Sequence, residues 1–167
     1  MIAMGRWFLP VVSAVSSFYD LPWINGLMAI LSHAIGSVII VKMLDIKKGV
    51  TAALIGGMIA SFPTVTSVMM YNYIADAYAI SFLMACIAAY LLTKHKPNYI
   101  LSVILIALSV GIYQAYITVI IMLLLLFLIK EIYSSEIKVK DILIKCLKFL
   151  TTGGIGMGLY YLVLTII

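Results

Sequence analysis

Arg6 is the only arginine in a chain of 167 residues that also contains ten lysines, and its side chain is the one best suited to bind a phosphate. A guanidinium is always charged and presents a planar fork of N–H donors that matches two phosphate oxygens. The adjacent Trp7 is a second candidate substrate-binding residue. An arginine beside a tryptophan is also typical of a side chain anchored among lipid headgroups. Arg6 therefore has two interpretations, phosphate binding and membrane anchoring.

Two acids, Asp20 and Asp76, could act as a general base on a hydroxyl group or stabilise positive charge on a sugar ring. Each also has a structural alternative. Asp20 could cap a turn or helix, and Asp76 would suit a helix N-terminus. Asn72 precedes Asp76 by four residues, so the two would share a helix face if the helix begins that early. We treat both acids as catalytic candidates and Asn72 as a substrate-binding candidate.

Tyr113 and Gln114, followed by Tyr116, could stack on and hydrogen-bond to a sugar, although eleven tyrosines in an apolar chain also fit an aromatic belt at a membrane surface. We expect His33 to form a hydrogen bond to a neighbouring helix rather than to bind a ligand. No phosphate-binding glycine loop, zinc-ligand spacing or serine-triad motif occurs in the sequence. We therefore predict no metal site and no cofactor.

Composition places these candidates in a membrane. The chain is 65% hydrophobic and only 10% charged, with a mean hydropathy of +1.22. A domain of this size has too little interior to bury so much apolar surface, so lipid must be part of its solvent. The net charge of +5 comes from lysines beside apolar runs. There they indicate contacts with anionic lipid headgroups, and we expect no nucleic-acid binding.

Apolar runs separated by lysine clusters predict the helices that position the candidates. The first run covers residues 21–41. A second covers residues 49–75, where Pro63 predicts a kink. Asp76 opens a third, which ends before Lys94.

Residues 97–129 carry no charge and would be about 50 Å long as one helix, which is too long for one crossing of a core ~30 Å thick and short for two. Lys96 and Lys130 should lie on the same side, so we predict two short helices that turn at residues 111–116. A break of this kind survives in a membrane only where protein or water surrounds it, which favours a cavity there.

The two ends of the chain complete the predicted fold. Residues 7–18 are too short for a span and predict a re-entrant or interfacial segment. Residues 131–148 form either an interfacial helix or the first turns of a last span over residues 149–167, in which Gly154 and Gly158 would allow close packing. The sequence thus predicts an all-α, polytopic integral membrane bundle of about six transmembrane helices, in a single membrane domain over residues 1–167.

The lysine clusters also predict an orientation. Cytoplasmic loops are enriched in Lys and Arg, so the clusters indicate the inside. The opposite, outer face then carries the candidate site residues, which are Arg6, Trp7, Asp20, Asn72, Asp76, Tyr113 and Gln114.

Four motifs follow one another along the chain: Gly5-Arg6-Trp7-Phe8, Phe18-Tyr19-Asp20-Leu21-Pro22-Trp23-Ile24-Asn25-Gly26, Ala75-Asp76-Ala77-Tyr78 and Gly111-Ile112-Tyr113-Gln114-Ala115-Tyr116. In this order, and spanning Gly5 to about Ile129, they resemble the Gtr-type polytopic membrane glucosyltransferases known from phage-encoded O-antigen modification and bacterial surface-polysaccharide loci.

The resemblance implies a GT-C-like enzyme of the bacterial cytoplasmic (inner) membrane. Such an enzyme takes a sugar from a polyprenyl-phosphate-linked donor and adds it to a glycan acceptor, such as O-antigen, on the outer face. It also implies that Arg6 contacts the donor phosphate, and it favours Asp20, Asp76, Tyr113 and Gln114 as site residues.

One departure from the family pattern concerns the N-terminus. In GT-C enzymes an acid in the first external loop usually carries catalysis, and only residues 1–4 precede Gly5. We therefore expect this chain to be part of a larger glycosyltransferase core, to lack the first span and first external loop, and not to catalyse transfer alone.

Two alternative functions stay open at this point. A transporter or flippase of lipid-linked sugars would also need a broken helix and a lone arginine, but it should contain an inverted repeat, and none is visible. The second alternative is a catalytically inactive membrane module that only binds partners.

Overall fold

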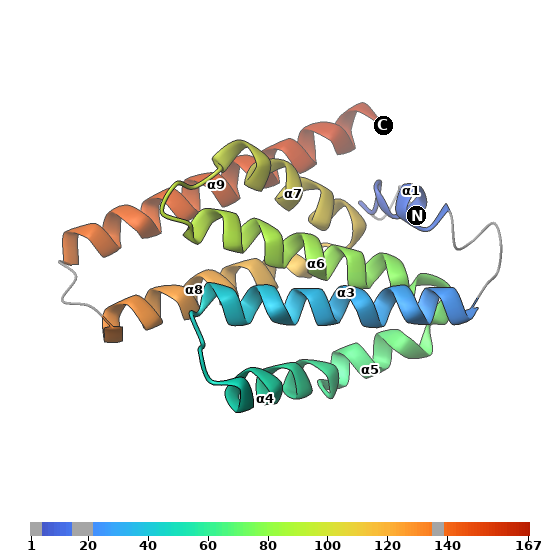
Figure 1. Cartoon of the computed structure of the whole chain (residues 1–167). Coiled ribbons are helices and arrows are strands. Elements are labelled where there is room, and N and C mark those ends of the chain that lie inside the picture. Colours follow the sequence, from blue (N-terminus) through green and yellow to red (C-terminus); the bar gives the residue numbers. More distant parts are fainter. Residues whose placement is uncertain (1–4, 15–21, 135–138) are drawn as a thin grey trace.

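The computed structural model describes residues 5–14, 22–134 and 139–167, and within these residues the protein is built of helices without strands (Figure 1). The helices are α1 (Leu9–Val12), α3 (Pro22–Met43), α4 (Gly49–Ala60), α5 (Pro63–Met70), α6 (Asn72–Thr93), α7 (Tyr99–Ile112), α8 (Tyr116–Ser134) and α9 (Val139–Ile166).

Four of these helices, α3, α6, α8 and α9, are long and apolar enough to cross a membrane, and the bent pair α4–α5 makes a fifth candidate span. The predicted all-α membrane bundle is therefore confirmed. Of the two short helices expected between the lysines, only α7 is short. Its 14 residues extend about 21 Å, less than a core of ~30 Å. The prediction was wrong for α8, because that helix continues through Lys130 and Glu131 to Ser134.

The predicted kink at Pro63 is a break between α4 and α5, whose axes differ by 47°. Proline lacks the N–H that would continue the helix, and it disfavours helical backbone at the residue before it. Phe62 is accordingly extended, and Pro63 becomes the first residue of α5.

Helix α6 is the centre of the bundle and packs against α3, α7 and α8. Small residues allow the close approach of α3. Ala29 of α3 is fully buried with Ala75 and Ala79 of α6. Towards α7, the hydroxyl groups of Ser81 and Ser109 each donate to the carbonyl of the other residue, at 2.9 and 3.0 Å. A polar pair satisfied in this way fixes the register of two apolar helices.

Helix α9 packs on α7 through a stripe of Thr152, Gly156 and Tyr160, which recur every four residues and are all buried. A methyl group at Gly156 would lie 2.7 Å from Cγ2 of Ile106. The expectation that Gly154 and Gly158 make the close packing was wrong. Both lie on other faces of α9, with nothing within 4 Å of an added methyl group.

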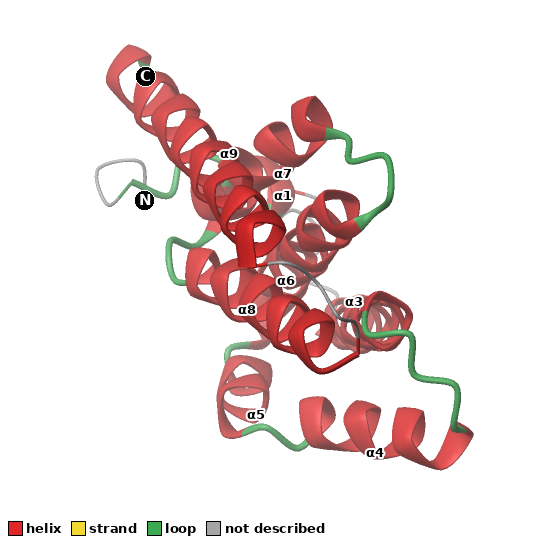
Figure 2. Cartoon of the chain, turned by 90° about the vertical axis from the view of Figure 1, so that its left-hand side faces the viewer, coloured by secondary structure: helices red, strands yellow, loops and turns green. Residues whose placement is uncertain are grey.

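The described loops and helix ends that carry lysines lie at one end of the bundle, on the left in Figure 1. There Lys145 of α9 donates to both carboxylate oxygens of Glu131 on α8, at 2.6 and 2.7 Å. Because α9 is continuous from Val139, the described residues after 138 form the first turns of the last helix rather than a separate interfacial helix. Viewed from that end, α4 and α5 lie on one side of α3 and α8, whereas α7 and α9 lie on the other (Figure 2).

Candidate functional site

Residues 5–14 cross the end of the bundle opposite the lysine loops and dock at the break between α7 and α8 (Figure 1). The backbone N–H of Phe8 donates to the carbonyl of Gly111 at 3.0 Å. Leu9 is buried against Ala77 and Ile112. Helix α1 in this segment has four residues, and residues 15–18 of the predicted re-entrant or interfacial segment lie outside the described residues.

Gly111 makes this docking possible because its lack of a side chain leaves room for Trp7. A methyl group at Gly111 would lie 2.8 Å from Cε2 of the Trp7 indole. The indole Nε1 of Trp7 is buried and has no hydrogen-bond partner. Trp7, predicted to bind substrate, is therefore held against the break with one donor unused.

The guanidinium of Arg6 is held by two tyrosines. Its Nη1 donates to the hydroxyl of Tyr78 at 3.0 Å, and its Cζ lies 4.8 Å from the centre of the Tyr113 ring. The two rings stack on each other with centroids 4.9 Å apart. Within the described residues, the one ion pair joins Lys145 and Glu131, so no carboxylate neutralises Arg6. Its positive charge stays available for an anion.

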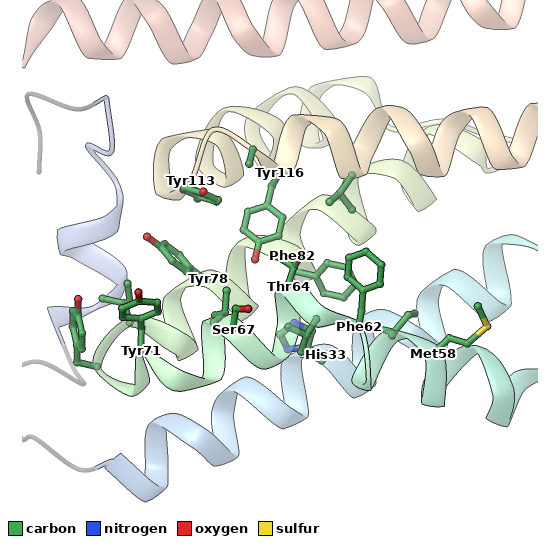
Figure 3. Close-up of a pocket in the computed structure, with 17 residues that line it drawn as sticks. His33, Met58, Phe62, Thr64, Ser67, Tyr71, Tyr78, Phe82, Tyr113 and Tyr116 are labelled. Carbon is green, nitrogen blue, oxygen red and sulfur yellow. The ribbon is translucent and has the colours of Figure 1, made fainter.

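Tyr78 and Tyr113 also line a cavity of about 850 Å³ between α3, α4, α5, α6 and α8 (Figure 3). The cavity extends along α5 from Tyr71 at one end to Met58 of α4 at the other. Its walls are mainly apolar and rich in aromatic rings: Phe62, Tyr71, Tyr73, Tyr78, Phe82, Tyr113 and Tyr116. The sequence predicted a cavity beside residues 111–116, and the structure has one there.

His33 lies beside Phe82 in this cavity (Figure 3), with the two rings stacked at 5.0 Å. Its Nδ1 forms a hydrogen bond of 2.9 Å with the carbonyl of Ala29. The expectation of a hydrogen bond to a neighbouring helix was wrong, because Ala29 is one turn earlier in the same helix. A carbonyl can only accept, so Nδ1 is the donor of this hydrogen bond.

Asp76 is buried, with 7% of its surface exposed, and its Oδ1 has no hydrogen-bond partner. Helix α6 begins at Asn72, a full turn earlier, so Asp76 is not the acid of a helix N-terminus as its structural alternative required. Residues two positions apart lie on nearly opposite sides of a helix. Asp76 therefore projects away from Tyr78, and the structure does not place it with Arg6.

The other candidates are only partly described. Asn72 is the first residue of α6, one turn before Asp76, as the shared-face hypothesis required. Asp20 lies outside the described residues.

Gln114 belongs to a second cluster that includes a residue the sequence did not predict. Its Nε2 donates to the hydroxyl of Tyr160 at 2.7 Å, and that hydroxyl donates to the carbonyl of Gly5 at 2.9 Å. Tyr160 comes from α9 and is 1% exposed. The spacing Thr152, Gly156, Tyr160 is visible in the sequence, but nothing local links it to Gly5.

Fold and site together define a helical membrane protein that presents, beside a long aromatic cavity, an arginine without a carboxylate partner among the described residues. A family model described as "Glucosyl transferase GtrII" matches residues 1–167, and the chain belongs to this glucosyltransferase family. No curated protein and no solved structure matches the chain. Among the described residues, no group of three His, Cys, Asp or Glu side chains could hold a metal ion.

Proposed function

We propose that this protein acts in the transfer of glucose from a polyprenyl-phosphate-linked donor to a cell-surface glycan such as O-antigen, on the outer face of the bacterial cytoplasmic membrane. The observation that carries the proposal is the position of Arg6, a cation without an acid partner in the described residues, held by two tyrosines of a mainly apolar cavity. A phosphate joined to an isoprenoid chain has the two matching properties, an anion and a long apolar tail.

In this proposal the donor phosphate binds to Arg6 and the isoprenoid tail lies along the cavity beside α5. The fork of the guanidinium suits two phosphate oxygens. The attraction between the guanidinium and the phosphate is stronger in surroundings of low dielectric constant than in water. The aromatic walls supply the apolar contact area for the tail. Tyr113, Gln114, Trp7 and Asn72 are the proposed contacts of the sugar and its phosphate.

The chemical step breaks the bond between C1 of glucose and the phosphate oxygen and forms a bond from C1 to an acceptor hydroxyl oxygen. The leaving polyprenyl phosphate gains negative charge, which Arg6 stabilises. The proton of the acceptor hydroxyl passes to a carboxylate, for which Asp76 and Asp20 are the candidates.

Replacement of Arg6 by lysine tests the proposal. An ammonium keeps the charge but loses the two-pronged geometry. In membranes that contain this chain within a full-length homologous enzyme, a donor with radiolabelled glucose should label the glycan. Arg6→Lys should reduce this labelling by about tenfold to a hundredfold, as expected for charge-assisted hydrogen bonds. Unchanged insertion into the membrane serves as the control, and wild-type labelling by Arg6→Lys would return Arg6 to the role of a headgroup anchor.

The same experiment separates transfer from transport. A flippase would move the lipid-linked glucose across the membrane and leave it joined to its lipid. Label that stays entirely on the polyprenyl phosphate, with protein-dependent movement between the leaflets, would favour the flippase and contradict the proposed transfer.

A further inference from the structure

Gly5, Gln114 and Tyr160, which we name the Gly5 latch, connect the last helix of the bundle to the residue next to Arg6. The Tyr160 hydroxyl donates to the Gly5 carbonyl at 2.9 Å and accepts from Nε2 of Gln114 at 2.7 Å. With 1% of Tyr160 exposed, both bonds are shielded from competing solvent. Hydrogen bonds in such surroundings are stronger and costly to lose.

The backbone at Gly5 shows that the latch is closely fitted. Gly5 has φ +76°, a conformation that glycine adopts without strain. A methyl group there would also overlap Nε2 of Gln114 and the Tyr160 hydroxyl. Both the conformation and the space therefore require glycine. The backbone of Gly5, which directly precedes Arg6, is held in one conformation.

Two anchors lie on either side of Arg6. The latch holds the carbonyl of Gly5, and the N–H of Phe8 is bonded to the carbonyl of Gly111 at 3.0 Å. Fixing the chain before and after Arg6 lowers the number of positions that its backbone can take. The long side chain then needs only Tyr78 and Tyr113 to set its direction.

We propose that Tyr160 is a positioning residue of the donor site, which acts through Gly5 and Gln114 to hold Arg6 in place for the donor phosphate. This inference rests on the proposed function for the identity of the anion. It assigns to α9, the helix farthest from Arg6 in sequence, control over how tightly that anion is bound.

The first test uses the fact that the chain has a single arginine. Phenylglyoxal modifies guanidinium groups, so its rate of incorporation at Arg6, followed by mass spectrometry, reports on the confinement of this one side chain. Tyr160→Phe removes the hydroxyl but keeps the ring, and it should raise the rate several-fold. The matched control is Tyr161→Phe, because the neighbouring Tyr161 is 58% exposed. Equal rates in wild type and Tyr160→Phe would overturn the latch.

The second test measures the affinity for farnesyl phosphate, a short isoprenoid phosphate, with the purified chain in lipid nanodiscs. Tyr160→Phe should raise the Kd about two- to tenfold, the effect of one ordinary hydrogen bond, whereas Tyr161→Phe should not. Gln114→Met, which keeps the side-chain length but removes the donor, should act like Tyr160→Phe. Faster modification of Arg6 without a change in Kd would overturn the positioning role.

A double variant separates positioning of Arg6 from a general loss of structure. In an Arg6→Lys background, Tyr160→Phe should not raise the Kd further, because its effect is transmitted through the guanidinium. Additive losses would show a merely structural role and overturn the inference. No binding of farnesyl phosphate to the wild-type chain would contradict the proposed function, and the phenylglyoxal rates would then still decide whether the latch exists.

Discussion

Among the residues that the structure describes, the side chains that hold Arg6 are two tyrosines, which carry no charge. A tyrosine hydroxyl and the face of a tyrosine ring orient the guanidinium without neutralising it. A cation over an aromatic face gains about 0.5–2 kcal/mol, depending on how far water is excluded. This is enough to select one side-chain position, yet it leaves the charge for a ligand.

At the residue scale we predict that Tyr78→Phe weakens anion binding. The change removes the hydrogen bond to Nη1 of Arg6 but keeps the ring that stacks on Tyr113. We expect a rise in the Kd for an isoprenoid phosphate of about three- to tenfold, since a typical hydrogen bond contributes about 0.5–1.5 kcal/mol.

The matched control for this prediction is Tyr73→Phe. Tyr73 lines the same cavity but is 60% exposed, and its hydroxyl forms no hydrogen bond with the residues that the structure describes. Loss of the Tyr73 hydroxyl should leave the affinity for the isoprenoid phosphate, measured by titration calorimetry, unchanged. Equal effects of the two variants would mean that the hydroxyl of Tyr78 does not orient Arg6.

The sequence allowed part of the site to be predicted at this scale. Arg6 and Tyr113 were both candidates, and the structure brings them together. Tyr78 and Tyr160 were missed for a physical reason. Tyr78 contacts Arg6, which is 72 positions earlier in the sequence, and Tyr160 contacts Gly5, which is 155 positions earlier. Only the packing of distant segments creates these contacts. A spacing rule sees neighbours within a helix, not partners across a bundle.

At the scale of helices, the positions of helix breaks were easier to predict than the faces through which helices pack on one another. Pro63 lacks an N–H wherever it stands in a helix, so the bend between α4 and α5 follows from one residue. The turn between α7 and α8 followed from the length of an uncharged run. Which side of α9 meets α7 depends on tertiary packing, and the glycines chosen from spacing alone were wrong.

The buried stripe of α9 gives a prediction for stability. Gly156→Ala forces a methyl group against Ile106, with 2.7 Å to its Cγ2 and 2.9 Å to its Cβ, so α7 and α9 must move apart. Overpacking of this kind typically costs about 1–3 kcal/mol. We expect a lower melting temperature for the protein in detergent, followed by circular dichroism.

Gly154→Ala is the matched control on the same helix, because nothing lies within 4 Å of the added methyl group. Alanine is the better helix former by about 0.8–1 kcal/mol, so this variant should be as stable as the wild type or slightly more so. Destabilisation by Gly154→Ala and not by Gly156→Ala would mean that another face of α9 meets α7.

At the scale of the whole molecule, charge and site lie at opposite ends. The lysine-bearing loops are at one end of the bundle, and the segment with Arg6 docks at the other (Figure 1). This arrangement follows from an even number of passes between successive lysine clusters, which is why the sequence sufficed to predict it. In the proposed orientation the lysines lie in the cytoplasm and Arg6 reaches the outer surface.

Single-cysteine labelling tests this orientation. In a background with Cys86 and Cys146 replaced, cysteines at Asp45 and His95 should resist a membrane-impermeant maleimide added to intact cells, because both positions lie in lysine-bearing loops. A cysteine at Tyr73, which is 60% exposed near the opposite end, should react. Permeabilised cells supply the control, since there the cysteines at positions 45 and 95 must become reactive. External labelling at position 95 with protection at position 73 would show that the bundle has the opposite orientation in the membrane. The proposed site would then face the cytoplasm, where a surface glycan could not reach it.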